Sequence, residues 1–320
     1  MAHSLTDKKP LAGNNVINQI AFVVRDIERA SEAFAQLLGI PKPNWFLTGD
    51  HEVSQVTFRG QPSDSRSKLV FMNTPTVQIE LIEPDQEPGT ISEFLDTVGE
   101  GIHHFAFDVD SIKDKLPDFE ENGYALLQSG KFTSSDGRYV YVDTLKSHKI
   151  LMELLESAEP RDTAPKTDVF TPLLGTNKIE QLAIVVKDLD AAAEEYCKLL
   201  GAEKPPVIQS GPSELTQVVF EGKPTEGESK YMFINTPLLQ LELIEPGDSP
   251  STWKKHLETQ GEGVHHISFL VNDMDEKVKL MENRGYPIIQ RGNFWNGKGR
   301  YAYMDTTATY KVIIELLERF

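Results

Sequence analysis

Two histidine doublets occur in nearly the same sequence context at two places in the chain. The stretch GEGIHHFAFDV at residues 99–109 returns as GEGVHHISFLV at residues 261–271, an offset of 162 residues. Imidazole nitrogens bind divalent metals and transfer protons near neutral pH. A histidine doublet that stands twice at the start of a strand-like segment is therefore a candidate for either chemistry.

Much of the chain repeats at the same offset. The matching pairs are 18–43 with 180–205, 68–84 with 230–246, 137–144 with 299–306, and 149–156 with 311–318. A repeat of this length predicts two copied domains rather than a solenoid. We expect a flexible tail at 1–14, a first domain at 15–156, a linker rich in Pro, Thr and charge at 157–176, and a second domain at 177–320.

The elements that must position the histidines follow from the pattern of apolar residues. The first copy has strand-like segments at 16–24, 69–73, 77–83, 103–109, 138–144 and 149–156, and helix-like segments at 26–39 and 110–123. Asp26 is a candidate N-cap for the first of these helices and Gly39 a candidate stop signal. The order strand, helix, strands occurs twice in each copy and predicts α+β domains, each built from two βαβββ modules.

Strand alternation places several polar side chains on the face opposite the packed one. In 16–24 the residues Ile20, Phe22 and Val24 share one face, which leaves Gln19 on the other. The same argument turns one polar residue per strand to the open face in four strands of each copy. These residues are Gln19, Glu80, His104 and Glu153 in the first copy and Gln181, Glu242, His266 and Glu315 in the second.

Each of these residues taken alone has an ordinary explanation, because an antiparallel sheet commonly leaves one face in water. Together, one imidazole nitrogen, two carboxylates and one amide oxygen form a donor set for a divalent metal, with positions left for water or substrate. The pattern therefore predicts two metal sites. Zn, Ni, Co, Mn, Fe and Mg all remain open as the metal.

The segments IAFVVRDIERA…LLGI, QIELIEP and GIHHFAFDV resemble the vicinal oxygen chelate (glyoxalase-like) superfamily. The resemblance covers about 17–156 and 179–318 and implies tandem domains, each a cupped mixed or antiparallel sheet around a metal. It implies the eight residues above as ligands, with His103 and His265 on the packed side. The sequence most resembles the methylmalonyl-CoA epimerase branch, in which the first metal ligand is usually His. The ligand set Gln/Glu/His/Glu instead resembles that of eukaryotic-type glyoxalase I.

The resemblance implies an isomerase or lyase that abstracts a proton next to the metal-chelated carbonyl of a small substrate or thioester. In such enzymes the final-strand glutamate acts as ligand and base in turn, so Glu153 and Glu315 are the expected catalytic residues. Two alternatives are an extradiol-type dioxygenase, which normally uses two His and one carboxylate, and a non-catalytic small-molecule binding protein. Arg138, Tyr141, Arg300 and Tyr303 precede the last strands and are candidates for substrate binding.

Composition limits the remaining classes. The chain has 320 residues and a net charge of −17, which disfavours nucleic acid and anionic membrane surfaces as partners. A single cysteine, Cys197, rules out an internal disulfide and a cysteine-based zinc site. With no signal-like or membrane-spanning apolar run, we expect a cytoplasmic protein that takes a small-molecule substrate as a monomer or homodimer.

Overall fold

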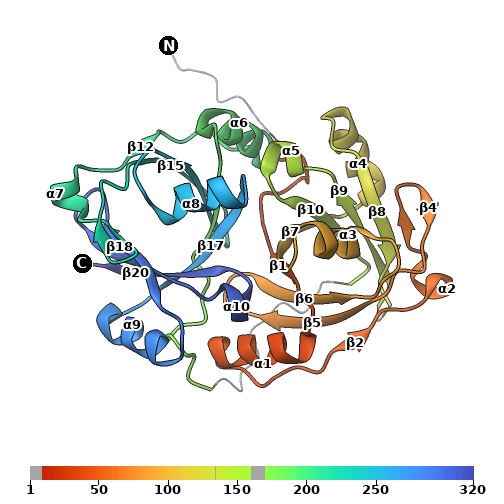
Figure 1. Cartoon of the computed structure of the whole chain (residues 1–320). Helices are drawn as coiled ribbons and strands as arrows, with labels where there is room; N and C mark the ends of the chain where they lie inside the picture. The colour runs from red at the N-terminus through yellow and green to blue at the C-terminus, as the bar shows by residue number, and fades with distance from the viewer. Residues whose placement is uncertain (1–8, 134, 160–169) are drawn as a thin grey trace, which may run out of the picture.

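The computed structural model describes residues 9–133, 135–159 and 170–320 as two curled sheets that lie side by side (Figure 1). In the first unit the strands are β1 (Gln19–Val23), β2 (Phe46–Leu47), β3 (Thr57–Phe58), β4 (Gln61–Pro62), β5 (Ser67–Asn73), β6 (Gln78–Pro84), β7 (Gly101–Asp108), β8 (Leu126–Lys131), β9 (Gly137–Val142) and β10 (Leu151–Ser157). Its helices are α1 (Ile27–Leu38), α2 (His51–Ser54), α3 (Thr90–Thr97), α4 (Ile112–Glu121) and α5 (Leu145–His148).

The second unit repeats this order. Its strands are β11 (Gln181–Val185), β12 (Ile208–Gln209), β13 (Val219–Phe220), β14 (Lys223–Pro224), β15 (Ser229–Asn235), β16 (Gln240–Pro246), β17 (Gly263–Leu270), β18 (Ile288–Asn293), β19 (Gly299–Met304) and β20 (Ile313–Arg319). Its helices are α6 (Leu189–Leu200), α7 (Ser213–Thr216), α8 (Thr252–Thr259), α9 (Met274–Asn283) and α10 (Thr307–Tyr310).

Each sheet has ten strands, and the first has the order β2-β5-β6-β1-β7-β10-β9-β8-β3-β4. Strand β1 pairs parallel with β6 and antiparallel with β7, and β7 pairs parallel with β10. The expected α+β fold of two tandem domains with cupped mixed sheets is therefore confirmed. Because all ten strands of a sheet come from one copy, each cup is completed within one unit. We call the concave face of the β1–β10 sheet the first cup and that of the β11–β20 sheet the second cup.

Local sequence explains the helix that follows the first strand. The Asp26 side chain accepts a hydrogen bond from the backbone N–H of Arg29, which caps α1. Gly39 ends the helix with a left-handed φ of 68°, a conformation that favours glycine. The apolar face of α1 packs on the convex side of the sheet, where Ile20, Phe22 and Phe34 are fully buried.

The two units contact each other with approximate two-fold symmetry. Phe34 of α1 packs edge-on against Tyr310 of α10 with ring centroids 5.4 Å apart, and the equivalent pair in the other direction is Tyr196 with His148 at 4.7 Å. The ion pair of Lys149 with Glu262 similarly has its counterpart in Lys311 with Glu100. These contacts pack the two units against each other.

The segments expected to be a tail and a linker also contact the neighbouring unit where they are described. The backbone N–H of Leu11 donates to the carbonyl of Leu199 at 2.9 Å, and that of Leu173 donates to the carbonyl of Leu37 at 3.1 Å. Within the expected tail Leu11 is thus hydrogen-bonded and Ala12 is buried, whereas 1–8 and 160–169 lie outside the described residues. None of the described helices is long and apolar enough to cross a membrane.

Candidate metal centre

The four polar residues predicted for the first copy lie on four adjacent strands of one sheet. They are Glu80 on β6, Gln19 on β1, His104 on β7 and Glu153 on β10. Glu80 and His104 flank Ala21 in one row of the sheet, while Gln19 and Glu153 flank Ala106 in the next row. Both alanines are fully buried. Their methyl groups leave room for the longer side chains on either side to converge.

The ligand atoms of three of these residues lie close together in a buried position. The Nε2 atom of His104 is 3.1 Å from Oε2 of Glu153 and 3.5 Å from Oε2 of Glu80. One ligand atom from each of the three residues lies within 4.8 Å of the other two. Neither His104 Nε2 nor Glu153 Oε2 forms a hydrogen bond with a described residue. Two buried carboxylates that face one imidazole nitrogen fit a divalent cation, which would offset their charge.

Gln19 lies in the neighbouring row of the same face and lines the same cavity as Glu80 and Glu153. Its amide nitrogen donates a hydrogen bond to Oε1 of Gln78 at 2.7 Å, which fixes the orientation of the amide group. Its own Oε1 is buried and accepts no hydrogen bond from a described residue. A buried carbonyl oxygen without a donor is costly unless a cation or water satisfies it. The donor chemistry of the first cup therefore fits a metal with one nitrogen and three oxygen ligands.

The prediction that His103 lies on the packed side is wrong, and the same holds for His265. The pairing of β1 with β7 shifts register between Ala21 and Phe22, so that a bulge takes up one residue of β7. His103 therefore packs edge-on against Tyr141 at 5.4 Å, on the side of the cup. Its Nδ1 lies 2.8 Å from Nδ1 of His104. This contact leaves Nε2 of His104 directed at the two carboxylates.

The pKa values of the two histidines in the doublet shift in opposite directions. Burial lowers the pKa of His103 well below its usual value, and the neighbouring His104 lowers it further. Burial also disfavours the charged form of His104, but the carboxylates of Glu153 and Glu80 outweigh this effect and raise its pKa to about 9. His103 is therefore neutral near pH 7, whereas His104 carries the proton that a metal ion would replace.

The second cup repeats the three close ligands. His266 Nε2 is 3.1 Å from Oε2 of Glu315 and 3.4 Å from Oε2 of Glu242. Gln181 also donates to its neighbouring glutamine, Gln240, at 2.6 Å. The amide oxygen of Gln181 differs from that of Gln19, however, because it accepts a hydrogen bond of 2.8 Å from the hydroxyl of Ser268.

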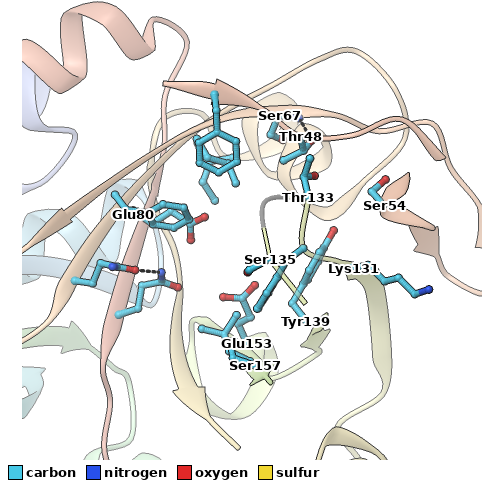
Figure 2. A pocket seen from close by; sticks show the side chains of 18 of the residues that line it. Thr48, Ser54, Ser67, Glu80, Lys131, Thr133, Ser135, Tyr139, Glu153 and Ser157 are labelled. Atoms are coloured by element: carbon cyan, nitrogen blue, oxygen red, sulfur yellow. Dashed lines mark hydrogen bonds between the residues drawn. The ribbon is translucent and has the colours of Figure 1, made fainter. Parts of the chain in front are cut away.

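A cavity of about 790 Å³ opens from the first cup. Gln19, Glu80 and Glu153 line it together with aromatic side chains and a series of hydroxyl groups. Figure 2 shows the carboxylates of Glu80 and Glu153 facing this space, with Tyr139 near Glu153 and Lys131 farther out. Gln19, Glu80 and Glu153 thus border space that a small molecule can occupy, with less than a tenth of each residue's surface exposed.

The candidate substrate-binding residues divide between the two faces of their strand. Tyr141 lines the cavity and its ring lies 4.9 Å from that of His104, and Tyr303 lies 4.8 Å from His266. Arg138 points to the other face, where it pairs with Glu156 at 3.2 Å and takes no part in the cavity lining. Arg300 is similarly engaged with Glu318 and Asp275. The two arginines therefore do not contact the cavity.

Sequence analysis missed several lining residues. Gln78 shares a face with Glu80 by strand alternation and recurs as Gln240, so the period of two could have identified it. Phe46 lines the cavity from a two-residue strand, where no periodic pattern marks it.

Comparison with known proteins places this geometry in a family. The family model described as Glyoxalase/Bleomycin resistance protein/Dioxygenase superfamily matches residues 18–142 and 180–303. The chain is 27% identical over 145 residues to YqjC of Bacillus subtilis strain 168, a protein described as uncharacterized, covering 44% of this chain and 92% of that one. It is also 27% identical over 116 residues to an ethylmalonyl-CoA/methylmalonyl-CoA epimerase of Cereibacter sphaeroides, covering 36% of this chain and 76% of that one.

Among solved structures, a mutant 4-hydroxymandelate synthase from Streptomyces coelicolor superposes with a TM-score of 0.59 at 15% identity. The match covers 96% of this chain and 93% of the synthase, and at this identity it supports the fold alone. The two family matches coincide with the two units that carry the Glu–His–Glu clusters. The chain therefore belongs to the glyoxalase/bleomycin resistance protein/dioxygenase (vicinal oxygen chelate) superfamily.

Proposed function

We propose that this chain is a metal-dependent isomerase or lyase that removes a proton from the carbon next to a carbonyl group of a small substrate. The observation that carries the proposal is the buried contact of 3.1 Å between His104 Nε2 and Glu153 Oε2 in the cup from which the cavity opens. Gln19, Glu80, His104 and Glu153 would hold a divalent cation. When bound, such a cation supplies a Lewis acid that stabilises the negative charge developing on the carbonyl oxygen.

The chain's own residues would supply the proton transfer. Glu153 lines the cavity and would serve as ligand and base in turn, because its carboxylate can accept a proton from a substrate carbon within reach when it does not hold the cation. Tyr141, packed against the His104 ring, would restrict how the substrate lies above the carboxylate. Leu155 and Ile82 form apolar lining nearby and would limit water access to the reacting carbon.

The alternatives receive less support from the geometry. A dioxygenase would need a second histidine in the cluster, but the cluster of close ligand atoms in each cup contains one histidine, and Nδ1 of His103 is directed at His104. A non-catalytic binding protein would leave two buried carboxylates beside one histidine, whose single positive charge offsets only one of them. The name of one relative, an ethylmalonyl-CoA/methylmalonyl-CoA epimerase, fits the proposed class of reaction.

The charged groups that line the cavity include the two carboxylates, Glu80 and Glu153, that would hold the cation. Four carboxylates line the cavity, against two lysines. One of these, Lys42, is paired with Glu28, which leaves Lys131 as the lysine without an ion pair among the described residues. A divalent cation would offset the charges of Glu80 and Glu153, which leaves Asp136 and Glu159 against the two lysines. Both neutral and anionic substrates are therefore compatible with the lining.

The test is solvent-deuterium exchange catalysed by metal-loaded protein. Two substrate panels, 2-oxo aldehyde hemithioacetals and 2-substituted acyl thioesters, should be followed by mass spectrometry and NMR. We expect exchange at the carbon next to the carbonyl in at least one panel. The double variant Glu153→Gln/Glu315→Gln should lose it, while Glu121→Gln, an exposed carboxylate on α4, should keep it.

Two results would count against the proposal. Undiminished exchange by the double variant would reject the two glutamates as bases. Absence of exchange with both panels, by wild-type protein that holds stoichiometric metal, would reject the reaction class.

A further inference from the structure

We propose that substrate enters only the first cup, and that in the second cup Tyr231 and Trp253 fill the space that a substrate would need and leave a cation site alone. The inference rests on the proposed function, since it assumes that the Glu–His–Glu clusters hold metal. It assigns different tasks to two sites whose ligand residues are the same in type and in spacing.

The two cups differ where the first cavity has its aliphatic wall. Leu69 on β5 and Ile91 on α3 line the cavity of the first cup. The residues 162 positions later are Tyr231 on β15 and Trp253 on α8. Both changes place a large ring where the first cup has a branched aliphatic side chain. The space that a substrate would occupy in the first cup is thus claimed by the protein's own side chains in the second.

The two rings are held in place by packing inside the second cup. Trp253 is only 2% exposed and packs edge-on against Tyr231, with ring centroids 5.8 Å apart. Its indole N–H donates a hydrogen bond of 3.2 Å to the hydroxyl of Tyr303. Tyr303 in turn lies with its ring 4.8 Å from that of the ligand His266. A continuous series of aromatic contacts, mostly edge-on, therefore connects Tyr231 and Trp253 with the candidate ligand His266.

A side chain beside the ligands reinforces the difference. Ala106 separates Gln19 from Glu153 in the first cup, and its counterpart in the second cup is Ser268. The Ser268 hydroxyl donates a hydrogen bond of 2.8 Å to the amide oxygen of Gln181, which therefore has a donor within the protein. The amide oxygen of Gln19 has no such donor among the described residues. The amide oxygen of Gln181 therefore needs no cation or water to satisfy it, and three candidate ligands for a cation remain in the second cup.

The experiment counts molecules of a chelating probe bound per chain. Protein loaded with Co²⁺ to two equivalents is dialysed against benzohydroxamic acid, a small bidentate oxygen ligand, and the visible spectrum of the cobalt reports direct contact with the metal. We expect one equivalent of probe per chain. Glu153→Gln should abolish the spectral change, whereas Glu315→Gln should preserve it.

Two double variants exchange the wall residues between the cups and test whether Tyr231 and Trp253 exclude the probe. Tyr231→Leu/Trp253→Ile copies the first wall into the second cup and should raise the stoichiometry from one probe to two. Leu69→Tyr/Ile91→Trp makes the reverse change and should lower it to zero while two cobalt ions stay bound. If either pair fails to fold, the single glutamate variants still decide between the cups.

The outcomes separate this inference from the proposed function. Two probes per chain in the cobalt-loaded wild type, or none, would overturn the assignment of the cups and leave the metal sites standing. Loss of the probe in Glu315→Gln but not in Glu153→Gln would overturn it as well. Failure of both cups to bind cobalt would contradict the proposed function and the inference together.

Discussion

Metal affinity should rise steeply with pH, because the histidine ligand must lose a proton before it can bind. In the metal-free protein the pKa of His104 is about 9, since Glu153 and Glu80 outweigh the effect of burial. The pKa of His266 is also about 9 for the same reason. Below this pKa the cation competes with one proton at each site, so affinity should fall about tenfold for every pH unit. Between pH 8 and pH 6 the loss is about a hundredfold, or about 2.7 kcal/mol.

The assay is competition with a chromophoric chelator at pH 6, 7 and 8 in buffers that do not bind metal. Isothermal titration in two buffers of different ionisation enthalpy gives the number of protons released with each metal ion, and we expect close to one near pH 7. In Glu153→Gln the nearest carboxylate is gone, so the pKa of His104 should fall and the pH dependence of the first site should flatten. An affinity that is flat from pH 6 to 8, without proton release, would refute the electrostatic reasoning.

Three further predictions concern other buried groups. Burial lowers the pKa of His148, at the contact between the two units, to about 4, so its stabilising neutral state is present above pH 6.5 and lost as the pH falls toward 4. The free energy of unfolding should therefore fall by about 3 kcal/mol between pH 7 and pH 4. Urea unfolding at these two pH values should show a smaller fall in His148→Phe, which lacks the titrating group. Ala106→Ser should give the oxygen of Gln19 a hydroxyl donor and weaken metal binding at the first site about fivefold, by chelator competition. His103→Phe should remove the partner of His104 Nδ1 and weaken metal binding about tenfold at unchanged unfolding midpoint, and equal affinity would mean that the contact does not orient the ligand.

Strand alternation was enough to predict the candidate ligands. Glu80, His104 and Glu153 lie on regular stretches of three strands, so a period of two placed each side chain on the correct face. The repeat at 162 residues predicted the same cluster in the second copy, which the structure brings together at nearly equal distances. The question of whether a cup is built within one copy needed the strand pairing, which no local pattern contains.

Features that depend on irregular geometry were not predictable in this way. The bulge in β7 moves His103 to the cup side, and no signal in the doublet marks it. The strand Leu126–Lys131 was missed because its sequence, LLQSGK, is short and lacks clear alternation. Whether a cup is open depends on side chains such as Leu69 and Ile91, which meet only after folding.

The strand-edge arginines show a further limit of pattern analysis. Arg138 and Tyr141 lie three positions apart, so alternation places them on opposite faces, and only the tyrosine lines the cavity. The repeat in the second copy did not reveal this difference. Residues that form structural ion pairs, such as Arg138 and Arg300, are repeated in both copies just as lining residues are.

An anomalous difference map at the zinc absorption edge, from crystals of the zinc-loaded protein, would locate the bound metal directly. We expect one peak in contact with Glu80, His104 and Glu153 and a second in contact with Glu242, His266 and Glu315. Zinc bound only at other positions, or no anomalous peak in either cup, would contradict this expectation.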